Sequence, residues 1–134
     1  MKLSELKVLV IDDSVYKAMD ITRALEYSGI RDVVRARHQE AGFEKIYEGK
    51  KSERPIGLIV TDMHYPLDAG IEADYDAGFK LIERLKKEEL DIPVIICSSH
   101  NFNDSRILGS VWYSEQRDLN RDFKEVVERL ESFC

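Results

Sequence analysis

Cysteine, proline and long hydrophobic runs are scarce in this chain. Two of its 134 residues are cysteine and three are proline. Cys97 lies in an apolar run and Cys134 is the last residue, so they have neither metal-ligand spacing nor the pattern of a disulfide framework. No apolar stretch approaches the roughly 18 residues that cross a bilayer, and the N-terminus has no signal-peptide core. We therefore expect a cytoplasmic protein with no membrane segment.

An excess of positive charge is also missing. The chain has 20 Lys and Arg against 26 Asp and Glu, a formal net charge of -6. Sequence-independent binding of nucleic acid needs clustered cations that displace counterions from phosphates, so we expect no direct nucleic-acid partner. The length suits one domain, and 43% hydrophobic with 34% charged residues is typical of a globular protein. We expect residues 1–134 to form a single domain with no output domain.

Short aliphatic runs alternate with amphipathic segments along the chain. The expected strands are Leu6–Ile11, Asp32–Ala36, Ile56–Thr61, Pro93–Cys97 and Ser110–Tyr113. The expected helices run from Val15 until Gly29, over Gln39–Glu48 and Gly78–Glu89, and finally from Leu119 to Leu130. The interval between the fourth and fifth strands has room for only a short helix. This alternation predicts an α/β fold with an open, doubly wound, five-stranded parallel sheet.

Short polar residues follow three of these strands. Asp12 and Asp13 follow the first strand, Asp62 the third and Ser98 the fourth. Because the ligand site of such a sheet lies outside the carboxyl ends of its strands, we expect the four side chains to converge. Three carboxylates repel one another, and Mg²⁺ relieves that repulsion while keeping positions open for phosphoryl oxygens. The pattern therefore predicts a Mg²⁺ site with Asp62 as nucleophile and the Ser98 hydroxyl as a donor.

Each of these residues also has a simpler interpretation. An Asp after a strand is often a helix cap or a turn residue, and a lone serine is more often a satisfied hydroxyl than a phosphate ligand. Their joint placement at three strand ends favours the functional interpretation.

Three segments resemble the receiver domain of two-component response regulators. They are VLVIDDS at Val8–Ser14, LIVTDMHYP at Leu58–Pro66 and IPVIICSS at Ile92–Ser99. The resemblance covers nearly the whole chain. It implies a flavodoxin-like sheet with the strand order 2-1-3-4-5, the order of the chemotaxis receiver that is a standard example of this fold.

The resemblance also implies a role for each site residue. Asp12 and Asp13 would be the acidic pair that holds Mg²⁺, together with Asp62 and the backbone carbonyl of His64. Asp62 would be the phospho-acceptor, and Ser98 would sense the phosphoryl group.

The end of the chain departs from the family pattern. Trp112 fits the switch aromatic of the family, although a core or edge-strand aromatic is an equally open interpretation. Receivers usually carry a Lys after the fifth strand that pairs with phosphoryl oxygens; counting from Trp112, Glu115 stands there, and residues 88–123 contain no lysine. Arg106 or Arg117 could reach the site, but a guanidinium is not a simple substitute for an ammonium.

One loop is longer and more acidic than is usual in the family. It is Leu67–Ala77, which we interpret as a solvated insert, with a partner-recognition loop as the alternative.

These residues are compatible with three functions. The favoured one is a stand-alone response regulator receiver of a two-component phosphorelay. It would take a phosphoryl group on Asp62 from a histidine kinase or phosphotransfer protein and signal by protein–protein interaction to an unknown downstream protein. It would not be an enzyme beyond self-phosphorylation and slow self-dephosphorylation.

The alternative is a degenerate receiver that binds partners independently of phosphorylation, as Glu115 suggests. A metal-dependent phosphatase is disfavoured because His64 stands where its second catalytic Asp is expected. Whether the chain forms a homodimer is left open.

Overall fold

Five parallel strands form the middle layer of the molecule. The computed structural model describes residues 2–133, with side chains described for 2–131, so the predictions made for Cys134 lie outside the described residues. The strands are β1 (Lys7–Ile11), β2 (Asp32–Ala36), β3 (Ile56–Thr61), β6 (Val94–Ser98) and β7 (Gly109–Trp112). Their order is β2-β1-β3-β6-β7. This confirms the predicted doubly wound, flavodoxin-like sheet with the order 2-1-3-4-5.

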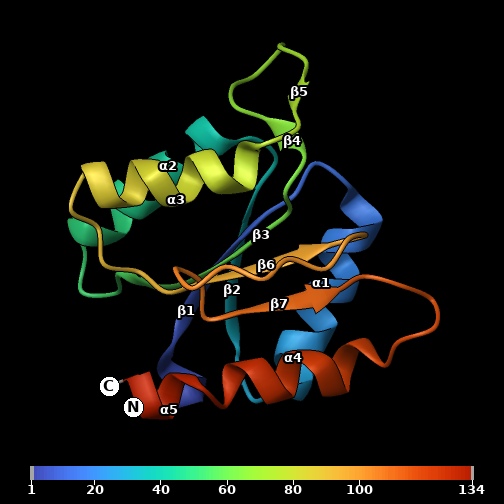
Figure 1. Cartoon of the computed structure of the whole chain (residues 1–134). Coiled ribbons are helices and arrows are strands. Elements are labelled where there is room, and N and C mark those ends of the chain that lie inside the picture. The colour runs from blue at the N-terminus through green and yellow to red at the C-terminus, as the bar shows by residue number, and fades with distance from the viewer. Residues whose placement is uncertain (1, 134) are drawn as a thin grey trace.

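Helices cover both faces of this sheet (Figure 1). Helices α2 (Gln39–Lys50) and α3 (Ala77–Lys87) lie on one face, and α1 (Val15–Tyr27) and α4 (Leu119–Val127) lie on the other. The turns η1 (Leu3–Glu5) and α5 (Leu130–Phe133) flank them in sequence. None of the helices in the described part of the chain combines the length and hydrophobicity that a bilayer span requires.

Strand β1, which has a neighbour on each side, shows why both faces must be covered. Val8 and Val10 point into the hydrophobic cluster beneath α1 and α4, and Leu9 and Ile11 point into the cluster beneath α2 and α3. All four side chains are fully buried. Successive residues of a strand face opposite sides, so a continuous aliphatic run is stable only between two helical layers.

A serine precedes helix α1 and a glycine follows it. Ser14 precedes its first turn, and the Ser14 side chain accepts a hydrogen bond from Lys17 N. At the other end, Gly29 has a φ of +100°, which a glycine adopts without strain. Val15, an apolar residue at the start of the helix, is 42% exposed, whereas Lys17 is buried in the same turn.

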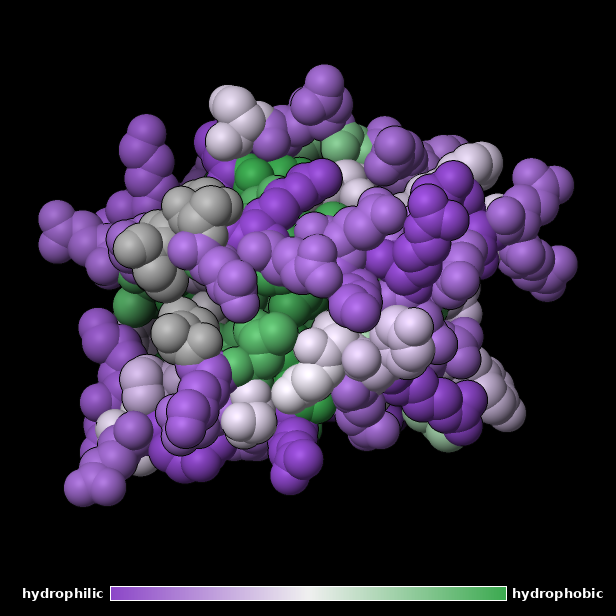
Figure 2. Space-filling view, turned by 90° about the horizontal axis from the view of Figure 1, so that it is seen from below, coloured by the Kyte–Doolittle hydropathy of each residue, from purple (hydrophilic) through white to green (hydrophobic). Residues whose placement is uncertain are grey.

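The outer face of helix α4 is charged, as its periodicity predicts. Phe123, Val126 and Val127 face the core, whereas Lys124 and Glu125 are exposed. Viewed from this side, the surface is mostly hydrophilic, with hydrophobic residues showing between the charged ones (Figure 2).

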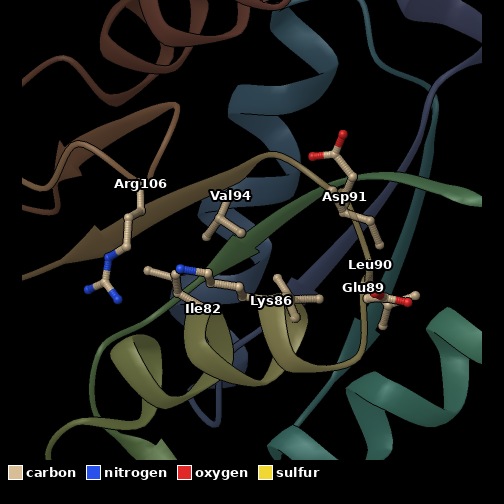
Figure 3. A pocket seen from close by; sticks show the side chains of 9 residues that line it. Ile82, Lys86, Glu89, Leu90, Asp91, Val94 and Arg106 are labelled. Atoms are coloured by element: carbon tan, nitrogen blue, oxygen red, sulfur yellow. The ribbon is translucent and has the colours of Figure 1, made fainter.

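The expected short helix between β6 and β7 is wrong. Residues 99–108, all of which are described, form an irregular loop. Polar side chains stabilise the loop: Asp104 Oδ1 accepts a hydrogen bond from Arg106 N at 2.8 Å, and Ser110 Oγ accepts one from Phe102 N at 3.1 Å. Such local bonds compete with helical ones. Beside the loop, a groove of about 570 Å³ runs along α3 toward Arg106 (Figure 3).

The acidic loop Leu67–Ala77 contains more structure than expected. A small antiparallel hairpin pairs β4 (Tyr65–Pro66) with β5 (Ala73–Asp74). The loop forms the turn and the second strand of this hairpin and then leads to helix α3. At the base of the hairpin, the rings of His64 and Tyr75 stack with their centroids 4.2 Å apart.

Candidate functional site

Three carboxylates meet at the carboxyl ends of neighbouring strands. Asp12 and Asp13 follow β1, and Asp62 follows β3. One carboxylate oxygen of each lies within 4.8 Å of one from each of the others. Asp12 is buried, Asp62 is half-buried and Asp13 is exposed, so the cluster opens toward solvent at Asp13.

Asp12 links the cluster to the start of helix α1. Its Oδ1 accepts a hydrogen bond from Ser14 N at 2.9 Å. Its Oδ2 is buried and accepts no hydrogen bond of acceptable geometry from the described residues, although Lys17 Nζ lies 3.0 Å away. Burial raises the pKa of the Asp12 carboxyl, against the lowering effect of the Lys17 charge. A buried oxygen of this kind, beside two further carboxylates, suits a hard cation such as Mg²⁺.

Asp62 is held by its neighbours and remains within reach of solvent. Its Oδ1 accepts a hydrogen bond from Met63 N at 2.7 Å and lies 3.0 Å from Lys17 Nζ. Its side chain is 16% exposed. The carboxylate is therefore fixed through one oxygen in a position that a small phosphoryl donor can approach.

A buried polar network supports the backbone of Asp62. Thr61 Oγ1 donates to Asp62 O at 2.8 Å and lies 2.9 Å from the Tyr65 hydroxyl, to which Gln39 Nε2 donates at 3.3 Å. Burial raises the pKa of Tyr65 to about 12, so this hydroxyl stays protonated. The network links the strand end to the start of helix α2.

Lys17 is a candidate site residue that the sequence patterns did not reveal. The side chain is 8% exposed, and its ammonium lies 3.0 Å from Asp12 Oδ2 and from Asp62 Oδ1. It also donates to Cys97 O at 2.7 Å. Burial acts to lower the pKa of Lys17, but the charges of Asp12 and Asp62 outweigh it and raise the pKa. The available signal was a lysine one helical turn after the acidic pair.

The two arginines considered for this role lie elsewhere. Arg106 pairs with Asp104 at 2.7 Å, and Arg117 pairs with Asp122 at 2.8 Å. The hypothesis that one of them reaches into the site is therefore wrong in this conformation.

Ser98 and Trp112 lie side by side at the ends of β6 and β7. They are register partners in the sheet. Ser98 is 5% exposed, and its Oγ accepts a weak hydrogen bond from His100 N at 3.4 Å. Trp112 is 41% exposed, and its indole N–H donates to Ser99 O at 2.9 Å. Glu115 follows in an exposed turn. The sensing role of Ser98 and the switch role of Trp112 stay predictions.

His64 follows Asp62 at the base of the hairpin. Its side chain is exposed and stacks on Tyr75. The metal contact expected of its backbone carbonyl does not involve this ring and stays a prediction.

Gly78 allows helix α3 to begin against the Asp62 backbone. A Cβ at this position would lie 3.0 Å from Asp62 O and 3.2 Å from Met63 Cα. We expect Gly78→Ala to lower the free energy of unfolding by about 1–3 kcal/mol, the usual cost of overpacking a rigid contact. Urea denaturation measures this loss. Gly57→Ala is the control, because its Cβ would mainly meet the flexible end of Leu6; an equal loss in both variants would contradict the argument.

Comparisons with known proteins identify a family and a shared fold. The model of the response regulator receiver domain matches residues 8–109. No curated protein sequence matches significantly. Among solved structures, the response regulator TrrA from Thermotoga maritima, in complex with Mg²⁺ and BeF, is 19% identical with a TM-score of 0.67, covering 96% of this chain and 99% of its own.

Two further solved structures show the same fold. A receiver domain protein from Clostridium thermocellum is 20% identical with a TM-score of 0.63, over 96% of this chain and 99% of its own. RcsB from Salmonella enterica serovar Typhimurium, bound to a promoter, is 21% identical with a TM-score of 0.66, over 96% of this chain and 66% of its own.

Proposed function

This chain belongs to the response regulator receiver domain family, and from that premise we propose that it accepts a phosphoryl group on Asp62 and signals through protein contacts. Receiver domains are signalling domains. The observation that carries the proposal is the cluster of Asp12, Asp13 and Asp62, whose oxygens lie within 4.8 Å of one another at the carboxyl ends of two strands.

The donor set fits Mg²⁺. It consists of carboxylate oxygens, one of them the buried Oδ2 of Asp12. We propose that Asp12, Asp13, Asp62 and the backbone carbonyl of His64 would hold the ion. When bound, Mg²⁺ would supply positive charge that neutralises phosphoryl oxygens.

The protein's own groups orient the acceptor. Met63 N and Lys17 Nζ both contact Oδ1 of Asp62, which holds this oxygen in place and leaves Oδ2 available. A carboxylate held in this way is a competent nucleophile toward phosphorus, because little covalent chemistry beyond positioning is required of the protein. Ser98 would donate its hydroxyl to the transferred group, and Trp112 would change its position when Ser98 does.

The partners follow from this role. A histidine kinase or phosphotransfer protein would donate the phosphoryl group, and an unidentified downstream protein would read it. The net charge of -6 supports protein rather than nucleic acid as the binding partner. The proposal places the protein in the cytoplasm.

Asp62→Asn tests the proposal. The wild-type chain, incubated with acetyl phosphate and Mg²⁺, is expected to gain the mass of one phosphoryl group, and the variant is expected to gain none. The amide keeps the size of the side chain but is not a nucleophile. Intact-protein mass spectrometry makes the measurement, and Asp68→Asn, in the exposed loop, is the matched control. Equal labelling of wild type and Asp62→Asn would reject phosphorylation of Asp62.

A second candidate is a receiver that binds partners without phosphorylation. Lys17 favours it, because its ammonium already neutralises part of the carboxylate cluster. In that case the Asp62→Asn variant would bind its partner as well as the wild type does, and no phosphoryl adduct would form.

A further inference from the structure

Lys17 supplies a buried positive charge to the site from helix α1. Its ammonium contacts Asp12 Oδ2, Asp62 Oδ1 and Cys97 O at 3.0, 3.0 and 2.7 Å. The contacts with the two carboxylates are ion pairs, and the contact with Cys97 O is a hydrogen bond. Because the three oxygens come from the ends of β1, β3 and β6, the charge is fixed in the middle of the rim where the site lies.

The end of β7 holds an aromatic ring where a cation is expected. Ser98 is paired with Trp112, and Tyr113 follows, with its backbone N donating to Ser98 O at 2.7 Å. The Lys17 ammonium lies 5.5 Å from the centre of the Tyr113 ring, within the range of a cation–π contact. The Tyr113 hydroxyl donates to Asp20, which ties the ring to α1. Thus the strand end packs against the lysine of the helix.

We propose that Lys17 is the phosphoryl-binding cation of this receiver, so that the charge usually carried by the fifth strand comes from the first helix. The inference rests on the proposed phosphorylation of Asp62 and assigns a residue to it. Both elements meet the same rim of the sheet, so a lysine reaching from α1 can occupy the place of one that extends from β7.

The proposed chemistry requires charge and no proton from Lys17. An oxygen of Asp62 forms a bond to phosphorus, and the bond between phosphorus and the donor group breaks. The bonding electrons leave with the donor, which takes a proton from solvent. The ammonium then exchanges its contact with Asp62 Oδ1 for one with a phosphoryl oxygen, and it remains protonated throughout.

The same position makes Lys17 a competitor of Mg²⁺. The ammonium contacts two of the three carboxylates that would hold the metal. Removing its charge leaves a more negative cluster, which attracts a divalent cation more strongly. Loss of Lys17 should therefore raise the affinity for Mg²⁺ and lower the affinity for a phosphoryl group. A merely structural role would not change the two affinities in opposite directions.

Lys17→Met tests the inference with the full chain. Methionine keeps an unbranched apolar side chain and removes the charge. We expect the affinity for beryllofluoride in saturating Mg²⁺ to fall at least about tenfold, and the affinity for Mg²⁺ alone to rise about threefold or more. Fluorine NMR and titration calorimetry measure the two quantities. Lys51→Met, on an exposed lysine after α2, is the control and should match the wild type.

The outcomes separate this inference from the proposed function. If the wild type forms no beryllofluoride adduct at Asp62, the proposed function fails, and the inference fails with it. If the wild type forms the adduct and Lys17→Met binds beryllofluoride within twofold of it, the inference alone is overturned.

A second measurement needs no variant. The buried ammonium of Lys17 should give its own nitrogen signal in NMR spectra of the wild type. We expect this signal to shift when beryllofluoride is added in the presence of Mg²⁺, because one of its three contacts is exchanged. An unchanged signal upon formation of the adduct would overturn the inference even if Lys17→Met does not fold.

Discussion

Asp13→Asn is expected to weaken Mg²⁺ binding at least about tenfold. Asp13 is the exposed member of the carboxylate cluster, so the change removes one charged ligand and leaves the buried side chains in place. Even partners outside the first ligand shell typically contribute about 10–100-fold to metal affinity. Titration calorimetry with magnesium chloride measures the effect.

Stability measurements separate metal binding from folding in this variant. Without metal, the free energy of unfolding should stay within about 0.5 kcal/mol of the wild type, as for most surface substitutions. Saturating Mg²⁺ should stabilise the wild type and stabilise Asp13→Asn much less, because a ligand stabilises a fold according to its affinity. Asp91→Asn is the control, since Asp91 is exposed and precedes β6, at the opposite end of that strand from the site. Unchanged Mg²⁺ affinity in Asp13→Asn would remove that residue from the metal site.

Phe123→Ala is expected to lower the free energy of unfolding by about 3–5 kcal/mol, the usual cost of deleting a buried aromatic ring. Phe123 is fully buried in the cluster that joins α4, α1 and the sheet. The ring occupies space that the small members of this cluster, such as Ala18 and Ala24, cannot fill. Urea denaturation followed by circular dichroism measures the loss as a lower midpoint.

A control on the same helix distinguishes packing from helix formation. Glu125 lies on the exposed face of α4 and pairs with Arg121 at 3.4 Å. Glu125→Ala should cost less than about 1 kcal/mol, because exposed ion pairs contribute little. Equal losses in Phe123→Ala and Glu125→Ala would contradict the assignment of this face to the core.

The sheet could be predicted from the sequence because its signals are local. Aliphatic runs such as Lys7–Ile11 and Ile56–Thr61 have no other stable place than between two helical layers. The carboxylates at their ends were found by the same reasoning, since chain direction places the ends of parallel strands along one rim. The order of the strands came from the resemblance to receivers and not from periodicity.

The role of Lys17 could not be predicted from periodicity. A lysine in an amphipathic helix is usually solvated, and the apolar spacing of this helix includes Val15 and gives no place to Lys17. In the structure Lys17 is buried and Val15 is 42% exposed, because the carboxylates of Asp12 and Asp62 attract the ammonium inward. This attraction is a tertiary effect between segments 45 residues apart in sequence (Lys17 to Asp62), and it outweighs the cost of burying the charge.

The prediction for the segment between β6 and β7 was wrong for a different reason. The alternation of strands and helices and the length of the interval suggested a short helix, but Asn101, Asn103, Asp104 and Ser105 favour turns. Counting from Trp112 to the expected lysine also gave Glu115, whereas β7 ends at Trp112, the register partner of Ser98, and the first residue after the strand is Tyr113, whose backbone N donates to Ser98 O. Register in the sheet, which the sequence alone does not provide, decides this point.

A crystal structure determined with Mg²⁺ and beryllofluoride tests the central claim most directly. The account predicts one metal ion bound by Asp12, Asp13 and Asp62, and a beryllofluoride group attached to Asp62. Carboxylates that turn away from one another, or a Lys17 ammonium that keeps both ions out of the cluster, would contradict it.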